Sequence, residues 1–124
     1  MIEKYMLSAV TTGTTGSATG SNASSNVISG HVMAVYFACA SGGTATVTLS
    51  QQSAGENIIN LTQATSSAWY YPRRALSTNA GSVDLTYNGT SVVYGYYCVC
   101  DYLSMGITNA TTSATFSLNV YVEN

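Results

Sequence analysis

The strongest constraint on the fold of this chain is a two-residue alternation of apolar and polar side chains. From Thr44 to Ser50 every second residue is apolar, and the same pattern returns from Ala114 to Val122. Successive side chains of a β-strand point to opposite faces of a sheet, so this period predicts strands with one face in a core. No long stretch repeats apolar residues at helical spacing. The chain is therefore predicted to be all-β.

Turn residues divide the sequence into short runs. Gly, Ser, Asn and the single proline fall between stretches that are rich in Val, Ile, Thr and Tyr, a composition typical of strands joined by turns. The runs recur roughly every 8–12 residues, a spacing typical of two packed antiparallel sheets, and they predict about eight short strands. We expect an antiparallel β-sandwich, and this strand count favours a jelly roll.

Two segments carry more specific expectations. Val27 to Cys39 is apolar on both faces, so it is expected to be a central or doubly covered strand, with a bulge or bend at Gly30. Asn88-Gly89 is a hairpin turn signal. It is expected to join a strand over Val83–Tyr87 to a returning strand over Ser91–Cys100.

The N-terminal part is predicted to differ from the rest. A short strand near Lys4 to Thr11 leads into Thr12–Asn22, where glycines discourage regular structure. Residues 1–26 are therefore expected to form a strand or arm followed by a flexible Gly/Ser/Thr-rich loop. Residues 27–124 are expected to form a single β-sandwich domain, which a chain of 124 residues is long enough to stabilise.

Charge is scarce throughout the chain. Only 6% of the residues are charged and the net charge is -2, whereas typical soluble domains have about 25% charged residues. Without clustered Lys and Arg, binding to a phosphate backbone is not expected. The apolar runs are too interrupted to span a bilayer, and the first residues lack the pattern of a secretory signal. We expect neither nucleic acid nor a membrane as a partner, and synthesis in a cytoplasm.

Groups suited to catalysis or metal binding are few. His31 is the only histidine and has no Cys or Asp at a motif spacing, so a surface or interface position is expected. The carboxylates are scattered and indicate neither a glycosidase pair nor a calcium cage. The cysteines are expected to be small strand residues. These two sets are Glu3, Glu56, Asp84, Asp101 and Glu123, and Cys39, Cys98 and Cys100. We expect no enzymatic activity, no metal and no cofactor.

Ten tyrosines suggest a binding surface. Seven of them could form a sugar-binding face, because aromatic rings stack on the apolar faces of sugars: Tyr70, Tyr71, Tyr87, Tyr94, Tyr96, Tyr97 and Tyr102. Tyrosine is equally suited to half-buried sheet faces and to protein interfaces, where it combines a large contact area with a polar end. The protein interface is favoured here over the sugar.

The rarest residues of the chain lie side by side. Trp69-Tyr70-Tyr71-Pro72-Arg73-Arg74 contains the only Trp, the only Pro and two of the three basic residues. Proline lacks the donor of a ladder hydrogen bond, so Trp69–Leu76 is expected to be extended at a sheet edge or to connect two sheets. Because Trp, Tyr and Arg are enriched in interface hot spots, the predicted interface is Trp69, Tyr70, Tyr71, Arg73, Arg74, Tyr94 and Tyr96. In the alternative, Trp69 covers the core and the arginines are solvated.

Several stretches, taken in order, resemble small structural proteins of tailed bacteriophages. They are Val10–Gly13, Ser29–Tyr36, Thr44–Leu49, Trp69–Ala75, Asp101–Ile107 and Val120–Glu123. In order and spacing the resemblance covers nearly the whole chain, and it is to head decoration, or cement, proteins. It implies a β-sandwich that binds the outside of an icosahedral shell without enzymatic activity, although this chain has fewer charges and more tyrosines and cysteines than the usual pattern.

The resemblance also implies partners and a location. The partners would be further copies of the chain, as a homotrimer, and the major capsid protein, whose carboxylates Arg73 and Arg74 would meet. The location would be the capsid surface of the virion, after synthesis in the bacterial host cytoplasm. Two alternatives stay open, namely a carbohydrate-binding module of a phage fibre and another structural component of the head or tail.

Overall fold

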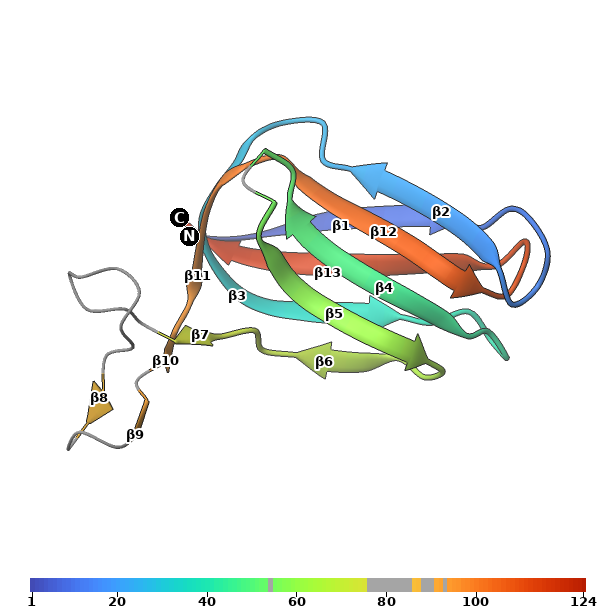
Figure 1. The fold of residues 1–124 in the computed structure, drawn as a ribbon. Coiled ribbons are helices and arrows are strands. Elements are labelled where there is room, and N and C mark those ends of the chain that lie inside the picture. Colours follow the sequence, from blue (N-terminus) through green and yellow to red (C-terminus); the bar gives the residue numbers. More distant parts are fainter. Residues whose placement is uncertain (54, 76–85, 88–90, 93) are drawn as a thin grey trace.

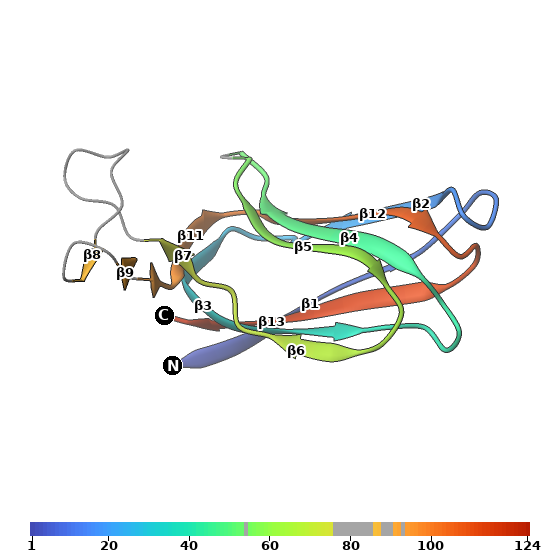
Figure 2. The ribbon, with the colours of Figure 1, turned by 60° about the horizontal axis from the view of Figure 1, so that its bottom comes forward.

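All regular structure in the described part of the chain is β-strand, as predicted. The computed structural model describes residues 1–53, 55–75, 86–87, 91–92 and 94–124 (Figure 1). Two sheets pack face to face as the layers of a sandwich (Figure 2). Every strand pair is antiparallel.

The first sheet has five strands and the second has four. In spatial order the first contains β1 (Ile2–Val10), β13 (Thr115–Glu123), β3 (Ile28–Ala38) and β11 (Tyr97–Asp101), and β6 (Ala68–Tyr70) also pairs with β3. The second contains β2 (Ala18–Ala23), β12 (Leu103–Ala110), β4 (Ala45–Gln51) and β5 (Asn57–Ala64). β11 and β6 follow one another along the same edge of β3, which makes β3 the central strand that its two apolar faces predict.

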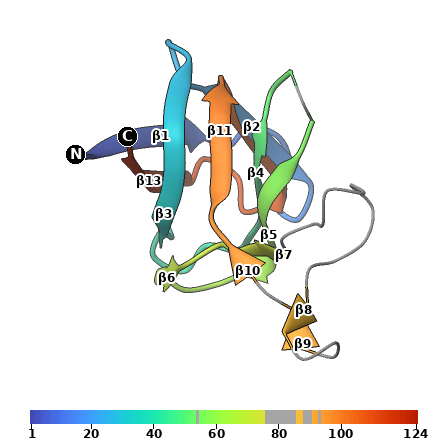
Figure 3. The same cartoon turned by 90° about the vertical axis from the view of Figure 1, so that its left-hand side faces the viewer.

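The strand pairs are nested like the two arms of one long ribbon. β4 pairs with β5, β3 with β6, β2 with β12 and β1 with β13. A ribbon of eight strands rolled into two sheets in this way is a jelly roll, so the predicted fold is confirmed. β11 is additional, and only Tyr102 separates it from β12, so the chain passes from the first sheet to the second at this corner (Figure 3).

Two short ladders lie outside the two sheets. β7 (Arg74–Ala75) pairs with β10 (Tyr94–Gly95), and β8 (Thr86–Tyr87) pairs with β9 (Ser91–Val92). The second ladder agrees with the predicted hairpin, although its Asn88-Gly89 turn lies outside the described residues, as do Val83–Leu85. Leu76, the predicted end of the extended segment, also lies outside them.

The core follows the alternation read from the sequence. Ala45, Val47 and Leu49 of β4 are fully buried. On β13 the predicted inward set is buried as well: Phe116, Leu118, Val120 and Val122, with Ala114 just before the strand. The rings of Phe37 and Phe116 are parallel, with centroids 6.1 Å apart.

The prediction of a flexible loop over Thr12–Asn22 is wrong for its second half. Residues 18–23 form β2, which pairs with β12, and Ala18 is completely buried. Low strand propensity is overcome here by tertiary pairing. Gly20 contributes because a Cβ at this position would lie 3.4 Å from the Val10 carbonyl oxygen, so its absence leaves room beside β1. β1 itself pairs with β13 over its whole length rather than forming a separate arm.

The bulge of β3 also differs from the prediction. Along the β13–β3 ladder Tyr121 is opposite Ala34 and Val122 is opposite Val32, so the extra residue is Met33 and not Gly30. Gly30 instead permits a close approach. Its φ is +140°, and a Cβ there would lie 2.4 Å from the Glu123 carbonyl oxygen.

Candidate functional site

The outer side of the first sheet presents large apolar side chains. In the described part of the chain, none of the exposed large apolar residues lies on β2, β4, β5 or β12. Leu7 of β1 points into the core, so the even-numbered residues of β1 point outward, as do Tyr36 and Tyr121 between buried neighbours. We call the outward set the aromatic face: Ile2, Lys4, Met6, Val10, Tyr36, Trp69, Tyr121 and Glu123.

Trp69 is the centre of a ring cluster on this face. β6 places it directly opposite Tyr36 of β3. Its ring centroid is 5.0 Å from that of Tyr36 and 5.4 Å from that of Tyr121, with interplanar angles of 52° and 37°. Trp69 is 49% exposed, so it does not cover the core as the alternative interpretation expected. The tilted rings form a ridged apolar surface instead of one flat platform.

The residues on either side of Trp69 point the other way. Tyr70 is half-buried and packs against the core, opposite Val35. Of the predicted interface residues it is therefore the one that the fold directs inward. Tyr97, named as a candidate sugar-binding residue, also packs against the core.

Arg73 is held by the chain's own carbonyl groups. Its Nη1 donates hydrogen bonds to Pro72 O at 2.8 Å and to Met33 O at 3.3 Å, and its guanidinium lies 4.0 Å from the centroid of the Tyr96 ring. Met33 is the bulged residue of β3, so its carbonyl is available to a side chain. These contacts fasten the segment after β6 onto the first sheet.

Arg74 connects the same segment to the second sheet. Its Nη1 lies 2.8 Å from Glu56 Oε2, and Glu56 Oε1 accepts a hydrogen bond from Gln51 Nε2 at 3.0 Å. The same Gln51 nitrogen lies 3.3 Å from Cys98 O. Both arginines therefore have partners within the chain, which the sequence did not indicate.

Three of the predicted tyrosines remain exposed around the β7–β10 ladder. Tyr71 and Tyr94 are each 63% exposed and Tyr96 is 40% exposed. We call these three residues the tyrosine tip. Tyr102 is also exposed, but it lies at the corner between β11 and β12. The side chain of Tyr87 is outside the described part of the structure.

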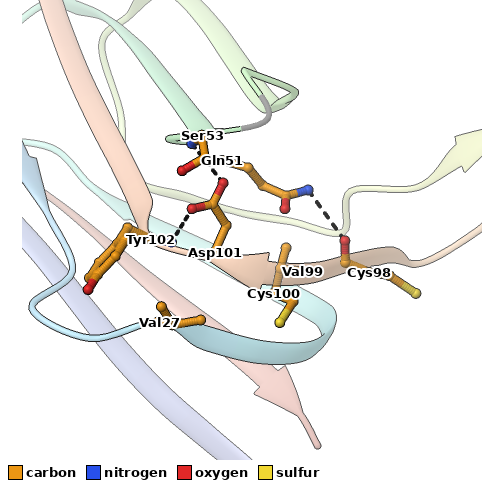
Figure 4. A pocket seen from close by; sticks show the side chains of 8 residues that line it. All are labelled: Val27, Gln51, Ser53, Cys98, Val99, Cys100, Asp101 and Tyr102. Carbon is orange, nitrogen blue, oxygen red and sulfur yellow. Dashed lines mark hydrogen bonds between the residues drawn. The ribbon is translucent and has the colours of Figure 1, made fainter.

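An open hollow of about 760 Å³ lies beside β11 (Figure 4). Its lining residues are Val27, Gln51, Ser53, Cys98, Val99, Cys100, Asp101 and Tyr102. The buried Asp101 carboxylate accepts hydrogen bonds from the backbone N–H groups of Ser53 and Tyr102, both at 2.7 Å. These bonds fix the corner where the chain changes sheets, so the structure gives Asp101 a structural role.

His31 lies across from two groups that could act with it. It is exposed, and the ladders place it opposite Cys98 on β11 and Glu123 on β13. Nevertheless, no group of three or more His, Cys, Asp or Glu in the described residues is arranged to hold a metal ion. All three cysteines are free thiols, and Cys98 and Cys100 are exposed. Burial raises the pKa of the Cys39 thiol.

One carboxylate near the N-terminus has an altered titration. The Tyr5 hydroxyl donates a hydrogen bond to Glu3 Oε2 at 2.5 Å, which lowers the pKa of Glu3 and raises the pKa of Tyr5. Asn124 Nδ2 donates to the other Glu3 oxygen at 3.3 Å, so Glu3 also contacts the end of the chain. Asp84, the remaining carboxylate of the sequence, lies outside the described residues.

Comparisons with known proteins add no relative. No family model matched the chain, and no curated protein or solved structure matched it significantly. In the described residues there is no helix long and apolar enough to cross a membrane. The functional argument therefore depends on the geometry of the chain itself.

Proposed function

We propose that the chain is a non-enzymatic structural protein of a tailed-phage virion, which binds the outside of the capsid and stabilises it. Its partners in this role are the major capsid protein and further copies of the chain, and its location is the capsid surface. The observation that carries the proposal is the uneven distribution of exposed aromatic and apolar groups. They gather on the aromatic face and the tyrosine tip of a jelly roll with only 6% charged residues.

The tyrosine tip is suited to contact a protein shell. Tyrosine provides a large contact area at low entropic cost, and interfaces are enriched in it. Each contact can be modest, because copies that are linked to one another on a lattice gain avidity far beyond that of a single site. Arg73 and Arg74 support this tip from within the chain, so their contribution to capsid binding would be to position Tyr96 and the segment that carries Tyr71.

Binding to phage heads lacking the chain tests the proposal. We expect the wild-type chain to bind purified heads with saturable occupancy, counted by quantitative gel analysis. A Tyr71→Ser/Tyr94→Ser variant should bind at least about tenfold more weakly, since hot-spot aromatics contribute 2 kcal/mol or more. Thr48→Ser on the opposite side of the sandwich is the matched control. Absence of saturable binding by the wild-type chain would contradict the proposal.

The arginines provide a second comparison. An Arg73→Ala/Arg74→Ala variant should lose occupancy only as far as the tip is displaced, because both side chains have partners within the chain. A loss larger than that of the double tyrosine variant would instead show direct pairing of the arginines with capsid carboxylates.

A carbohydrate-binding module of a phage fibre is the second candidate. The ring cluster of Tyr36, Trp69 and Tyr121 favours it, because half-exposed rings can stack on sugars. The interplanar angles of 52° and 37° count against it, since a pyranose ring needs a flat aromatic surface. Quenching of Trp69 fluorescence by soluble host glycans, with no binding to heads, would favour this candidate over the first.

A further inference from the structure

We infer that two copies of the chain pair through their aromatic faces, with the first sheet of one copy against the first sheet of the other about a two-fold axis. This inference deepens the self-association that is part of the proposed function, and it leaves the tyrosine tip free to contact a shell. It differs from the trimer implied by the resemblance, because a two-fold axis joins the same surface of both copies.

The first argument is the exposure of apolar side chains on an edge strand. Ile2, Met6 and Val10 follow one another along the outer side of β1 and are 59%, 64% and 58% exposed. Cross-strand register connects Met6 through Asn119 and Tyr36 to Trp69, so the apolar surface crosses four strands. Figure 2 shows no described element over this side of the first sheet. A continuous apolar surface of this kind is a common mark of association.

The second argument is the size of the face. β1 and β13 have nine residues each, which gives a length of about 30 Å at about 3.3 Å per residue. Four neighbouring strands at a spacing of about 4.8 Å give a width of about 19 Å. The flat footprint is then about 570 Å², and ridged side chains bury more accessible area than their footprint. Stable interfaces bury about 800 Å² per partner, so a face of this size suits one further copy.

The third argument is the charge on the face. Lys4 and Glu123 are diagonal neighbours in the β1–β13 ladder, since Glu123 is opposite Ile2 and Lys4 is opposite Tyr121. Neither has an ion-pair partner within the described residues, where Arg74 and Glu56 form the salt bridge. A two-fold axis near this point places Lys4 of each copy beside Glu123 of the other. A uniformly acidic or basic partner would match one of these charges and oppose the other.

A lysine placed on each outer face tests the pairing. Met6→Lys puts a charge in the centre of the aromatic face, and Thr48→Lys puts one in the centre of the opposite outer face. Sedimentation velocity from micromolar to millimolar concentration should show the wild-type chain and the Thr48→Lys variant passing from one copy to two. The Met6→Lys variant should pair at least about tenfold more weakly, because a charge buried without a partner opposes association.

A charge exchange keeps the test independent of how well Met6→Lys folds. Lys4→Glu should weaken pairing, and adding Glu123→Lys should restore it, since the exchanged charges again meet across the axis. A wild-type chain that remains single at millimolar concentration, or forms trimers that Met6→Lys leaves intact, would overturn the inference. Head binding is measured separately. Pairing without head binding contradicts only the proposed function, and head binding by a chain that never pairs contradicts only this inference.

Discussion

The two sheets of the sandwich are alike inside and different outside. Between them they bury aliphatic and aromatic side chains from both layers. Outside, the first sheet has the aromatic face, whereas the second has short polar side chains, which we call the hydroxyl face: Ser21, Thr46, Thr48, Ser50, Asn60, Ser104 and Thr108. The four strands of the second sheet contain no charged residue at all.

This difference separates what the fold requires from what it does not. Thr and Ser on the hydroxyl face complete the alternation of a strand as well as Met, Val and Tyr do on the aromatic face, because a strand needs only its inner side chains to be apolar. The apolar side chains on the outer side of the first sheet are therefore not required for folding. Their position is better explained by contact with something outside the chain.

Two glycines test whether the backbones of the two sheets differ as their surfaces do. Gly30→Ala in β3 should destabilise the protein by about 2–4 kcal/mol, because the new Cβ would meet the Glu123 carbonyl at an unfavourable φ. Gly106→Ala in β12 should change the free energy of unfolding by less than about 0.5 kcal/mol, since nothing lies within 4 Å of its added Cβ. Urea denaturation measures both. Equal effects would contradict the close approach at Gly30.

The sequence was sufficient for the fold class and for the strongest strands. Alternation in β4 and β13 identified their inner residues, because each has apolar side chains on one face alone. β2 was missed because residues 18–23 have almost no apolar pattern, and the strand depends on pairing with β12. The bulge was placed at Gly30 because glycine is the usual signal, whereas the register of β13 places it at Met33.

The candidate site was predicted only in part. Unusual composition identified Trp69, Tyr71 and their neighbours, but it could not show that Tyr70 points inward or that Arg74 meets Glu56. These are long-range contacts with no local signal. The exposed residues of β1 were missed for a different reason. Both faces of Ile2–Val10 contain apolar residues, so the sequence does not show that Met6 is outside and Leu7 inside.

Single side chains of the two outer faces provide the next comparison. Trp69→Ala should destabilise the single chain by about 1–2 kcal/mol, because it removes two ring contacts of about 0.5–1.5 kcal/mol each, partly offset by relaxation. Thr48→Ala on the hydroxyl face should change stability by less than about 0.5 kcal/mol. Thermal unfolding at low concentration separates these effects from pairing. A loss for Trp69→Ala no larger than that for Thr48→Ala would show that the ring cluster does not stabilise the fold.

The smallest expected effect concerns Arg74 and Glu56, the ion pair between the segment after β6 and the turn before β5. Their side chains are 46% and 31% exposed, and exposed pairs contribute about 0.2–1 kcal/mol, so Arg74→Ala should reduce the unfolding free energy by no more than that. The difference from wild type should shrink at about 1 M salt, where the Debye length is about 3 Å. Arg74→Lys, which keeps the charge, is the control. A larger loss that salt leaves unchanged would indicate that Arg74 acts through packing near Tyr97, whose ring centroid lies 5.9 Å from its guanidinium carbon. In that case the link between the two sheets at this edge would be apolar, like the core between them.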